Sequence, residues 1–180
     1  MRTRADTHAP PLPGATKDDQ SVTADWTVLQ EPIDGVQLIE VRNVIANSGH
    51  TTEVLRRDWF GGGVEIDQVF QVTLGAHGVS AWHVHMDTTD RLFVNAGQVK
   101  IALYDSRPQS RTLGLVNEFR VGDRRPGLVV IPPGVWHGVQ NLSTDLSCFV
   151  NLFNRPYDYD NPDEWRLPPD TPEIPYRFGP

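Results

Sequence analysis

Short runs rich in Val, Ile, Leu and Phe, each bounded by turn-forming residues, constrain the fold of this chain more than any other feature. Examples are VQLIEVRNVI, VEIDQVFQVTL, RLFVNAGQVKIALYD, GLVVI and SCFVNLF, which lie between residues 36 and 153. Gly, Pro, Asn and Asp separate the runs, and no long segment shows the 3.6-residue period of an amphipathic helix. We therefore predict an all-β domain of about eight to ten strands, arranged as a sandwich, jelly roll or barrel.

Three parts are expected along the chain. Residues 1–24 are rich in Pro, Ala, Thr and charged residues, which indicates a flexible tail or an arm that packs on a second subunit. Residues 25–155 carry the strand-like runs and form the predicted barrel. Residues 156–180 contain many prolines, acids and aromatics. We expect them to wrap over the barrel, with a short helix that begins at Asn161-Pro162-Asp163-Glu164.

Charge and composition exclude several classes of protein. The formal charge of −7 and the pI near 5.2 argue against a general nucleic-acid-binding protein, which usually carries a basic face. No apolar run approaches the roughly 20 residues of a membrane helix, and the N-terminal residues lack the apolar core of a signal peptide. The single cysteine excludes an intrachain disulfide. We expect a cytoplasmic protein that acts on a small molecule, without a nucleic-acid or membrane partner.

Two histidines lie one residue apart in the stretch AWHVHMDTTD, residues 81–90. If residues 79–86 form a strand, alternation places His83 and His85 on one face and Trp82 and Val84 on the other. Asp90 ends the stretch and begins the next predicted strand. A lone histidine in a strand is usually a structural residue that forms hydrogen bonds, and so is a lone Asp at the start of a strand.

The chain reads G-x4-H-x-H-x4-D-x6-G and later G-x4-P-x-G-x2-H-x3-N. This pattern resembles the two signature motifs of the cupin superfamily, except that cupins usually carry Glu at Asp90 and one more residue after each leading Gly. The resemblance implies a double-stranded β-helix, the cupin jelly-roll barrel, in which His83, His85, Asp90 and His137 surround one divalent metal. Three imidazoles and one carboxylate suit Fe, Mn, Co, Ni, Cu or Zn and do not suit Ca or Mg.

A second resemblance is to the dTDP-4-dehydrorhamnose 3,5-epimerase family. It is carried by VRNVIANSGHTTEVLRRDWF, IPPGVWHGVQNLS, FNRPYDYDNPDEW and PPDTPEIPYRF, and it spans residues 36–178. Members of that family are metal-free dimers. A His–Asp pair removes a proton beside a ketone, a Tyr donates one from the opposite face, and Arg and Lys hold the nucleotide sugar. The resemblance implies that His83, or His85 with a different gap, is the base, that Asp170 is its partner, and that the protein is a homodimer.

Three roles of the epimerase family are vacant in this chain. The family's Arg falls at Ala81 or Trp82, its Lys falls at Asp90, and its Tyr falls at Asn151. An amide does not donate a proton as a phenol does. Replacement of the Lys by Asp removes a cation and adds a metal ligand, so these differences favour the metal site over strict 3,5-epimerase chemistry.

The sequence therefore predicts a metal-dependent cupin enzyme that acts on a small oxygenated metabolite such as a sugar or nucleotide sugar. The metal would act as a Lewis acid in an epimerisation or isomerisation, with Asp170 or His77 as the base. Three alternatives stay open at this point. They are an Fe(II)-dependent dioxygenase, a non-catalytic sugar- or metabolite-binding cupin, and a degenerate barrel whose histidines are structural.

Overall fold

The computed structural model describes residues 12–25 and 27–179. The chain divides into two compact units, Met1–Glu31 and Pro32–Pro180. In the first unit, Val22 and Val28 form an isolated antiparallel bridge. The backbone N–H of Thr23 donates to the carbonyl of Thr27 at 2.9 Å and closes a turn. Residues 1–11 of the predicted tail lie outside the described part, and the boundary at residue 24 stays a prediction.

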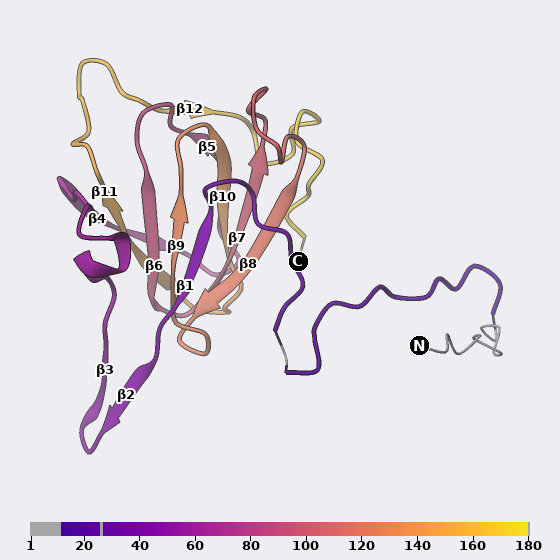
Figure 1. Ribbon diagram of the computed structural model, residues 1–180, viewed down its shortest axis with the longest axis horizontal. Helices are drawn as coiled ribbons and strands as arrows, with labels where there is room; N and C mark the ends of the chain where they lie inside the picture. Colours follow the sequence, from indigo (N-terminus) through magenta and orange to yellow (C-terminus); the bar gives the residue numbers. More distant parts are fainter. Residues whose placement is uncertain (1–11, 26, 180) are drawn as a thin grey trace. The chain divides into compact units, whose positions relative to one another are not determined.

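The second unit is built on two five-stranded antiparallel sheets (Figure 1). The first sheet has the order β1-β9-β6-β11-β4. Its strands are β1 (Gln37–Glu40), β9 (Gly127–Ile131), β6 (Asp90–Ala96), β11 (Ser147–Phe153) and β4 (Gln68–Leu74). The second sheet has the order β12-β5-β10-β7-β8. Its strands are β12 (Trp165–Arg166), β5 (Val79–Val84), β10 (Val135–Asn141), β7 (Gln98–Asp105) and β8 (Val116–Gly122).

Residues that alternate along the strands form the core between the two sheets. On β7, Val99, Ile101 and Leu103 are buried in this core, together with Leu92 of β6 and Phe149 of β11. This two-residue period is the reason that the apolar runs fold as strands. The predicted all-β jelly-roll barrel is confirmed.

The turns and the smallest sheet follow from local sequence. Gly97 adopts a φ of 78° between β6 and β7, so NAGQ forms a tight hairpin turn. IPPG makes the corner between β9 and β10. β2 (Asn43–Ala46) and β3 (Gly49–Thr52) pair as a hairpin that extends away from the larger sheets, and the 3-10 helix η1 (Arg57–Phe60) follows it (Figure 1). In the described part of the chain, no helix has the length and apolar character needed to cross a membrane.

The C-terminal segment wraps over the outer face of the second sheet, as predicted. Ile174 and Phe178 pack there with Trp82 and Ala102, and β12 adds to the edge of β5. The short helix predicted at residues 161–164 is wrong, because these residues form bends that lead into β12. The carboxylate of Asp163 accepts hydrogen bonds from a distant loop, which holds the segment in this bent conformation.

Candidate active site and metal centre

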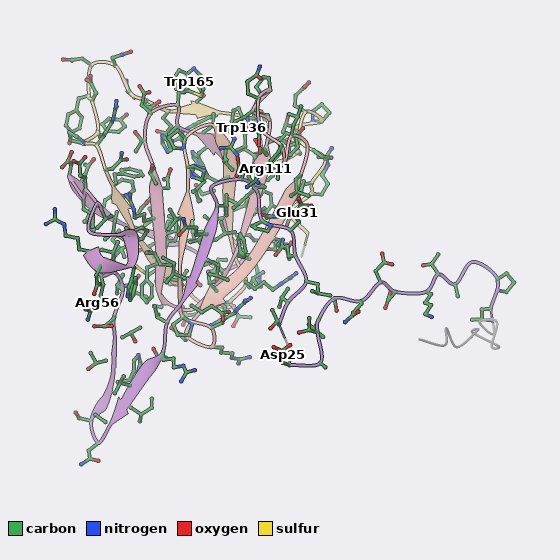
Figure 2. All side chains as sticks on the ribbon, in the orientation of Figure 1. Asp25, Glu31, Arg56, Arg111, Trp136 and Trp165 are labelled. Atoms are coloured by element: carbon green, nitrogen blue, oxygen red, sulfur yellow. The ribbon has the colours of Figure 1, made fainter. Side chains whose placement is uncertain are left out.

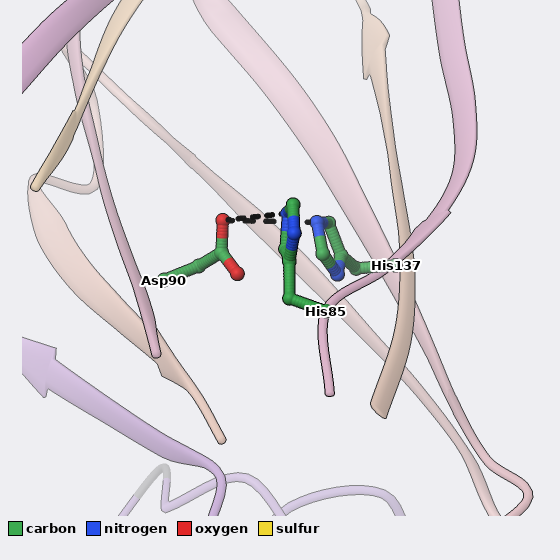
Figure 3. A group of neighbouring side chains, drawn as sticks. All are labelled: His85, Asp90 and His137. Atoms are coloured by element: carbon green, nitrogen blue, oxygen red, sulfur yellow. Dashed lines mark ion pairs between the residues drawn. The ribbon is translucent and has the colours of Figure 1, made fainter. Parts of the chain in front are cut away.

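His85, Asp90 and His137 meet inside the barrel (Figure 3). Asp90 begins β6 in the first sheet, His137 lies on β10 in the second, and His85 follows the last residue of β5. Oδ1 of Asp90 lies 3.7 Å from Nε2 of His85 and 3.8 Å from Nε2 of His137. One ligand atom from each of the three residues lies within 4.8 Å of the others. Three of the four predicted metal ligands therefore converge.

Neighbouring groups orient each of these three side chains. Nδ1 of His137 lies 3.2 Å from the carbonyl oxygen of Val135, and Nδ1 of His85 contacts the carbonyl oxygen of Asp163. Because a carbonyl only accepts, the neutral imidazoles carry their protons on Nδ1 and turn their Nε2 lone pairs toward Asp90. Outer contacts of this kind are typical of metal-binding histidines.

The spacing and chemistry of this group fit one divalent transition metal. Two lone pairs and an anionic oxygen repel one another unless a proton or a cation lies among them. Metal–ligand bonds of about 2.0–2.2 Å place neighbouring ligand atoms about 3–4 Å apart, which is near the separations of 3.7 and 3.8 Å found here. Imidazole and carboxylate ligands suit Fe, Mn, Co, Ni, Cu or Zn. Metal binding itself stays a prediction.

His83 lies beside the three-residue group, but both of its ring nitrogens contact other residues. Its ring centre is 5.9 Å from that of His137. Nδ1 lies 3.0 Å from Oε1 of Glu164, and Nε2 lies 3.0 Å from Oγ of Ser80. An ionised carboxylate only accepts, so Nδ1 of His83 carries the proton and Nε2 accepts from the Ser80 hydroxyl. His83 is thus held as an imidazole–carboxylate pair.

A bulge in β5 brings Ser80 and His83 to the same side of the strand. In the pairing of β5 with β10, His83 is opposite His137 and Ser80 is opposite Val139. Three steps along β5 therefore match two steps along β10. An extra residue of this kind shifts the alternation of side chains by one position. Side chains three residues apart can then contact each other, although strict alternation would separate them.

The protonation states of the pair suit a general base. Burial lowers the pKa of His83, the nearby His137 lowers it further, and the hydrogen bond to Glu164 only partly opposes this. Burial alone would raise the pKa of Glu164, but the hydrogen bond to His83 and the charge of Arg166 outweigh burial and hold this pKa below its usual value. A neutral imidazole beside an ionised carboxylate is the arrangement that accepts a proton and stabilises the resulting imidazolium.

Asp163 fixes the segment that brings Glu164 to His83. Its carboxylate accepts hydrogen bonds from the backbone N–H groups of Met86 and Asp87 at 2.8 and 2.9 Å, and from the Thr88 hydroxyl at 2.8 Å. Two residues later, β12 pairs with β5. Glu164 lies between these two attachments, so its position depends on the C-terminal wrap.

The three-residue group, the His83–Glu164 pair and Ser80 line one cavity of about 320 Å³ between the two sheets. The strands of the first sheet contribute mainly apolar side chains to its lining, apart from Asp90 and Asn151, and the lining around the histidines is polar. The lining residues are Phe70, Val72, Ser80, His83, His85, Asp90, Leu92, His137, Val139, Phe149, Asn151, Phe153, Tyr157, Glu164 and Arg166. A second cavity of about 620 Å³ shares His85, Phe153 and Tyr157 with the first. Trp165 also lines the second cavity and stands at the end of the barrel where β12 lies (Figure 2).

The two residues predicted as possible bases do not line either of these cavities. His77 is exposed in the turn between β4 and β5, with a φ of 56°, and it precedes β5, the strand that carries His83. Asp170 is exposed in a turn of the C-terminal wrap. The acid that contacts His83 is Glu164, a residue to which the sequence patterns assign no catalytic role. Ser80 is likewise indicated by no local pattern.

Comparisons with known proteins bear on the function of this site. No protein-family model matches the chain. The chain is 32% identical over 136 residues to the probable low-salt glycan biosynthesis epimerase Agl13 of Haloferax volcanii, covering 73% of this chain and 87% of Agl13. It is also 32% identical over 101 residues to the spore coat polysaccharide biosynthesis protein SpsL of Bacillus subtilis, covering 56% of this chain and 67% of SpsL.

Solved structures share the fold. A dTDP sugar isomerase from Desulfovibrio desulfuricans is 27% identical with a TM-score of 0.75, covering 81% of this chain and 92% of that chain. NovW, a 4-keto-6-deoxy sugar epimerase from Streptomyces spheroides, is 20% identical with a TM-score of 0.72, covering 81% of this chain and 75% of NovW. The similarity to Agl13 extends over most of both proteins. The chain therefore belongs to the cupin-fold family of sugar epimerases that includes Agl13, and it is an epimerase-type isomerase.

Proposed function

We propose that this protein is a metal-assisted sugar epimerase that moves a proton at a carbon beside a carbonyl group. The observation that carries the proposal is the content of one cavity. It holds the imidazole–carboxylate pair of His83 and Glu164 and, beside it, the three-residue group of His85, Asp90 and His137. His83 is therefore available as a base while the other three residues hold a metal, so the two roles do not compete for one side chain.

The residues of the chain would perform the proton transfer as follows. Nε2 of His83 takes the proton from the carbon, and the electrons of the broken C–H bond move toward the carbonyl oxygen. Glu164 stabilises the imidazolium that forms, because its carboxylate contacts Nδ1. A divalent metal held by His85, Asp90 and His137 would act as a Lewis acid toward an oxygen atom of the substrate.

The substrate that we propose is a keto sugar, either free or linked to a nucleotide. NovW is described as a 4-keto-6-deoxy sugar epimerase and Agl13 as a probable epimerase of glycan biosynthesis. The cavity of about 320 Å³ has the size of a small-molecule site. The second cavity next to it, lined in part by Tyr157 and Trp165, offers aromatic faces to the rest of the substrate.

Deuterium exchange tests the assignment of the base. The protein is incubated in D2O with a dTDP-linked 4-keto-6-deoxy sugar, and mass spectrometry measures deuterium uptake into the sugar. We expect His83→Ala and Glu164→Gln each to slow the uptake by about 100-fold or more, because general-base catalysis is worth about 10²–10⁴-fold. Asp170→Asn decides between the two acids. A larger loss in Asp170→Asn than in Glu164→Gln would contradict the pairing of His83 with Glu164.

Elemental analysis of tag-free protein tests the metal. We expect near-stoichiometric transition metal in the parent, none in a His85→Ala/His137→Ala double variant, and parent-like metal in His83→Ala. Loss of metal in His83→Ala as well would return His83 to the ligand set. A parent protein that carries no metal and takes none up from Fe, Mn, Co, Ni, Cu or Zn solutions would contradict the proposed metal site.

One observation favours a second candidate. Two histidines and one carboxylate with open positions form the ligand set of non-haem Fe(II) oxygenases, and His85, Asp90 and His137 match it. An Fe(II)-dependent dioxygenase would consume oxygen in proportion to the loss of the sugar. Full turnover of the sugar under anaerobic conditions would contradict this candidate and leave the epimerase.

A further inference from the structure

We infer that the second cavity binds a neutral sugar unit, so that the preferred substrate is a keto sugar joined through a glycosidic bond to another sugar, and not to a nucleotide diphosphate. The inference rests on the proposed function and names the part of the substrate that lies beyond the reacting ring. The position of the second cavity, the charges that line it and the aromatic rings at its edge support this assignment.

The second cavity adjoins the first and receives whatever is attached to the reacting sugar. His85, Phe153 and Tyr157 line both cavities. The first cavity, of about 320 Å³, contains His83 and the three-residue group. The second, of about 620 Å³, lies next to it, and Trp165 on its wall stands at the end of the barrel where β12 lies (Figure 2). A sugar that reacts at His83 would therefore place its substituent in the second cavity.

The charged groups along both cavities are mainly acidic. Five carboxylates and two guanidinium groups line them. The carboxylates are those of Asp87, Asp90, Asp158, Asp163 and Glu164, and the guanidinium groups are those of Arg155 and Arg166. The carboxylates outnumber the positive charges even when the charge of a divalent metal is counted.

Both cations already face a carboxylate. A guanidinium nitrogen of Arg166 lies 2.7 Å from Oε1 of Glu164, and one of Arg155 lies 3.5 Å from Oδ2 of Asp87. Proteins usually hold a diphosphate with Arg and Lys side chains that are free to pair with it. Among the described residues that line these cavities, no cation is free in this sense. A diphosphate here would also lie beside several carboxylates, which repel it.

The same carboxylates suit the hydroxyl groups of a neutral sugar. An ionised carboxylate only accepts hydrogen bonds, and each sugar hydroxyl can donate one. Asp87 is exposed, so its carboxylate can take further donors. Oδ1 of Asp158 accepts from the backbone N–H groups of Asp160 and Asn161. In the described part of the chain these bonds reach Oδ1 and leave Oδ2 for a ligand.

Aromatic rings complete the wall of the second cavity. Trp165 and Tyr157 line it, and they are 51% and 40% exposed, so their faces are accessible to a ligand. A pyranose ring carries C–H groups on its faces and hydroxyl groups around its rim. Its faces can pack on the aromatic rings while its rim bonds to the carboxylates. A neutral sugar therefore matches both the apolar and the acidic parts of this wall.

Three forms of one keto sugar test the inference. The same 4-keto-6-deoxy sugar is supplied as the dTDP ester, as the methyl glycoside and as a disaccharide linked through C1 to glucose. Deuterium uptake in D2O gives kcat/KM for each form. We expect the disaccharide to exceed the methyl glycoside by about fivefold or more, mainly through a lower KM, because a second ring packs on the aromatic wall. The dTDP-linked form should have the lowest value of the three.

Trp165→Leu tests the aromatic wall. The backbone of β12 pairs with β5, so the exchange of this side chain leaves the strand pairing in place. We expect the ratio of kcat/KM for the disaccharide to that for the methyl glycoside to fall close to one. Tyr159→Leu is the matched control, because Tyr159 is 85% exposed in the same segment and lines neither cavity. It should keep the ratio of the parent.

Asp87→Lys tests the charges. The variant replaces the carboxylate that faces Arg155 by a second cation. We expect it to raise kcat/KM for the dTDP-linked sugar by about fivefold or more relative to the methyl glycoside. Asp145→Lys makes the same change of charge at an exposed position that lines neither cavity, and it should keep the preference of the parent. Melting temperatures of all variants control for altered folding.

The other outcomes separate this inference from the proposed function. A parent protein that turns over the dTDP-linked sugar faster than both glycosides would overturn the neutral sugar site and leave the epimerase intact. So would an unchanged ratio in Trp165→Leu, or an unchanged preference in Asp87→Lys. Deuterium uptake into none of the three forms would contradict the proposed function itself.

Discussion

The hydroxyl of Ser80 controls how His83 presents its lone pair. It lies 3.0 Å from Nε2 of His83, while Glu164 holds Nδ1. The imidazole is thereby fixed at both nitrogens. One neutral hydrogen bond contributes about 1 kcal/mol, so we expect Ser80→Ala to slow deuterium uptake by roughly fivefold. Ser80→Thr keeps the hydroxyl and should restore most of the rate.

The same experiment distinguishes orientation from direct participation. A loss of about 100-fold or more in Ser80→Ala would mean that the hydroxyl passes the proton between the sugar and His83. An increase in rate would mean that Ser80 competes with the sugar for Nε2. Either result would contradict a purely orienting role. Melting temperatures of both variants control for altered folding.

The individual residues of the site differ in how far the sequence predicts them. His85 and Asp90 lie within one short stretch and His137 within a second motif, and the resemblance of the two stretches to the cupin motifs implies that they converge. Glu164 lies 81 residues from His83, and no local pattern records that contact, because the C-terminal wrap creates it. The family resemblance instead gives Asp170, the acid in PPDTP, as the partner of the base. In the structure Asp170 is exposed in a turn.

At the scale of elements, the bend at residues 161–164 connects the C-terminal wrap to the active-site residues. Asp163 accepts from the backbone N–H groups of Met86 and Asp87, and Glu164 follows it directly. We expect Asp163→Ala to release this segment and slow deuterium uptake by about tenfold or more. The donors are exposed, so water can replace the lost carboxylate and the free energy of unfolding should fall by only about 1 kcal/mol. Kinetics in D2O and urea unfolding measure the two effects.

Asp145→Ala is the matched control for that prediction. The carboxylate of Asp145 is exposed and accepts from the backbone N–H of the next residue, Leu146, at 2.7 Å. Its removal should leave the rate of deuterium uptake near that of the parent. Equal rates in Asp163→Ala and the parent would show that Glu164 keeps its place without this anchor.

The strands could be predicted because each has its own local sequence pattern. The bend at residues 161–164 could not be predicted in this way. Short apolar runs bounded by Gly-, Pro- or Asn-containing turns specify β6, β7, β9 and β10 locally. Asn161-Pro162 is an equally good start for a helix or a bend. The contacts of Asp163 with a distant loop decide between them. The bulge in β5 has no local signal either, because it depends on pairing with β10.

At the scale of the whole molecule, a buried carboxylate joins the start of the barrel unit to the second sheet. Asp105 ends β7 and is fully buried. It accepts hydrogen bonds from Arg107 at 2.8 Å and from Thr112 at 2.7 Å. The same two residues contact the backbone of Asp34. The guanidinium of Arg107 donates to its carbonyl, and its N–H donates to the hydroxyl of Thr112. Removing the charge should therefore loosen the barrel as a whole.

The contacts of Asp105 should consequently make the barrel less stable as the pH falls. Burial alone would raise the pKa of Asp105, but hydrogen bonds from Arg107, Ser110 and Thr112 outweigh burial and hold this pKa well below its usual range. A carboxylate whose pKa is lower in the folded state adds stability above its unfolded pKa, and this stability is lost as the pH falls toward the folded pKa. We expect Asp105→Asn to lower the free energy of unfolding by about 3 kcal/mol near pH 7.

Urea unfolding of the parent and of Asp105→Asn, measured from about pH 7 down to about pH 3, checks this prediction. The difference in the free energy of unfolding between the two proteins should be largest at neutral pH. It should shrink as the unfolded carboxylate becomes protonated, because the charge of Asp105 then stabilises the parent less. Asp19→Asn, which changes an exposed carboxylate, should behave as the parent does throughout. A difference that stays constant with pH would assign the stabilisation to packing around Asp105 instead of to its charge.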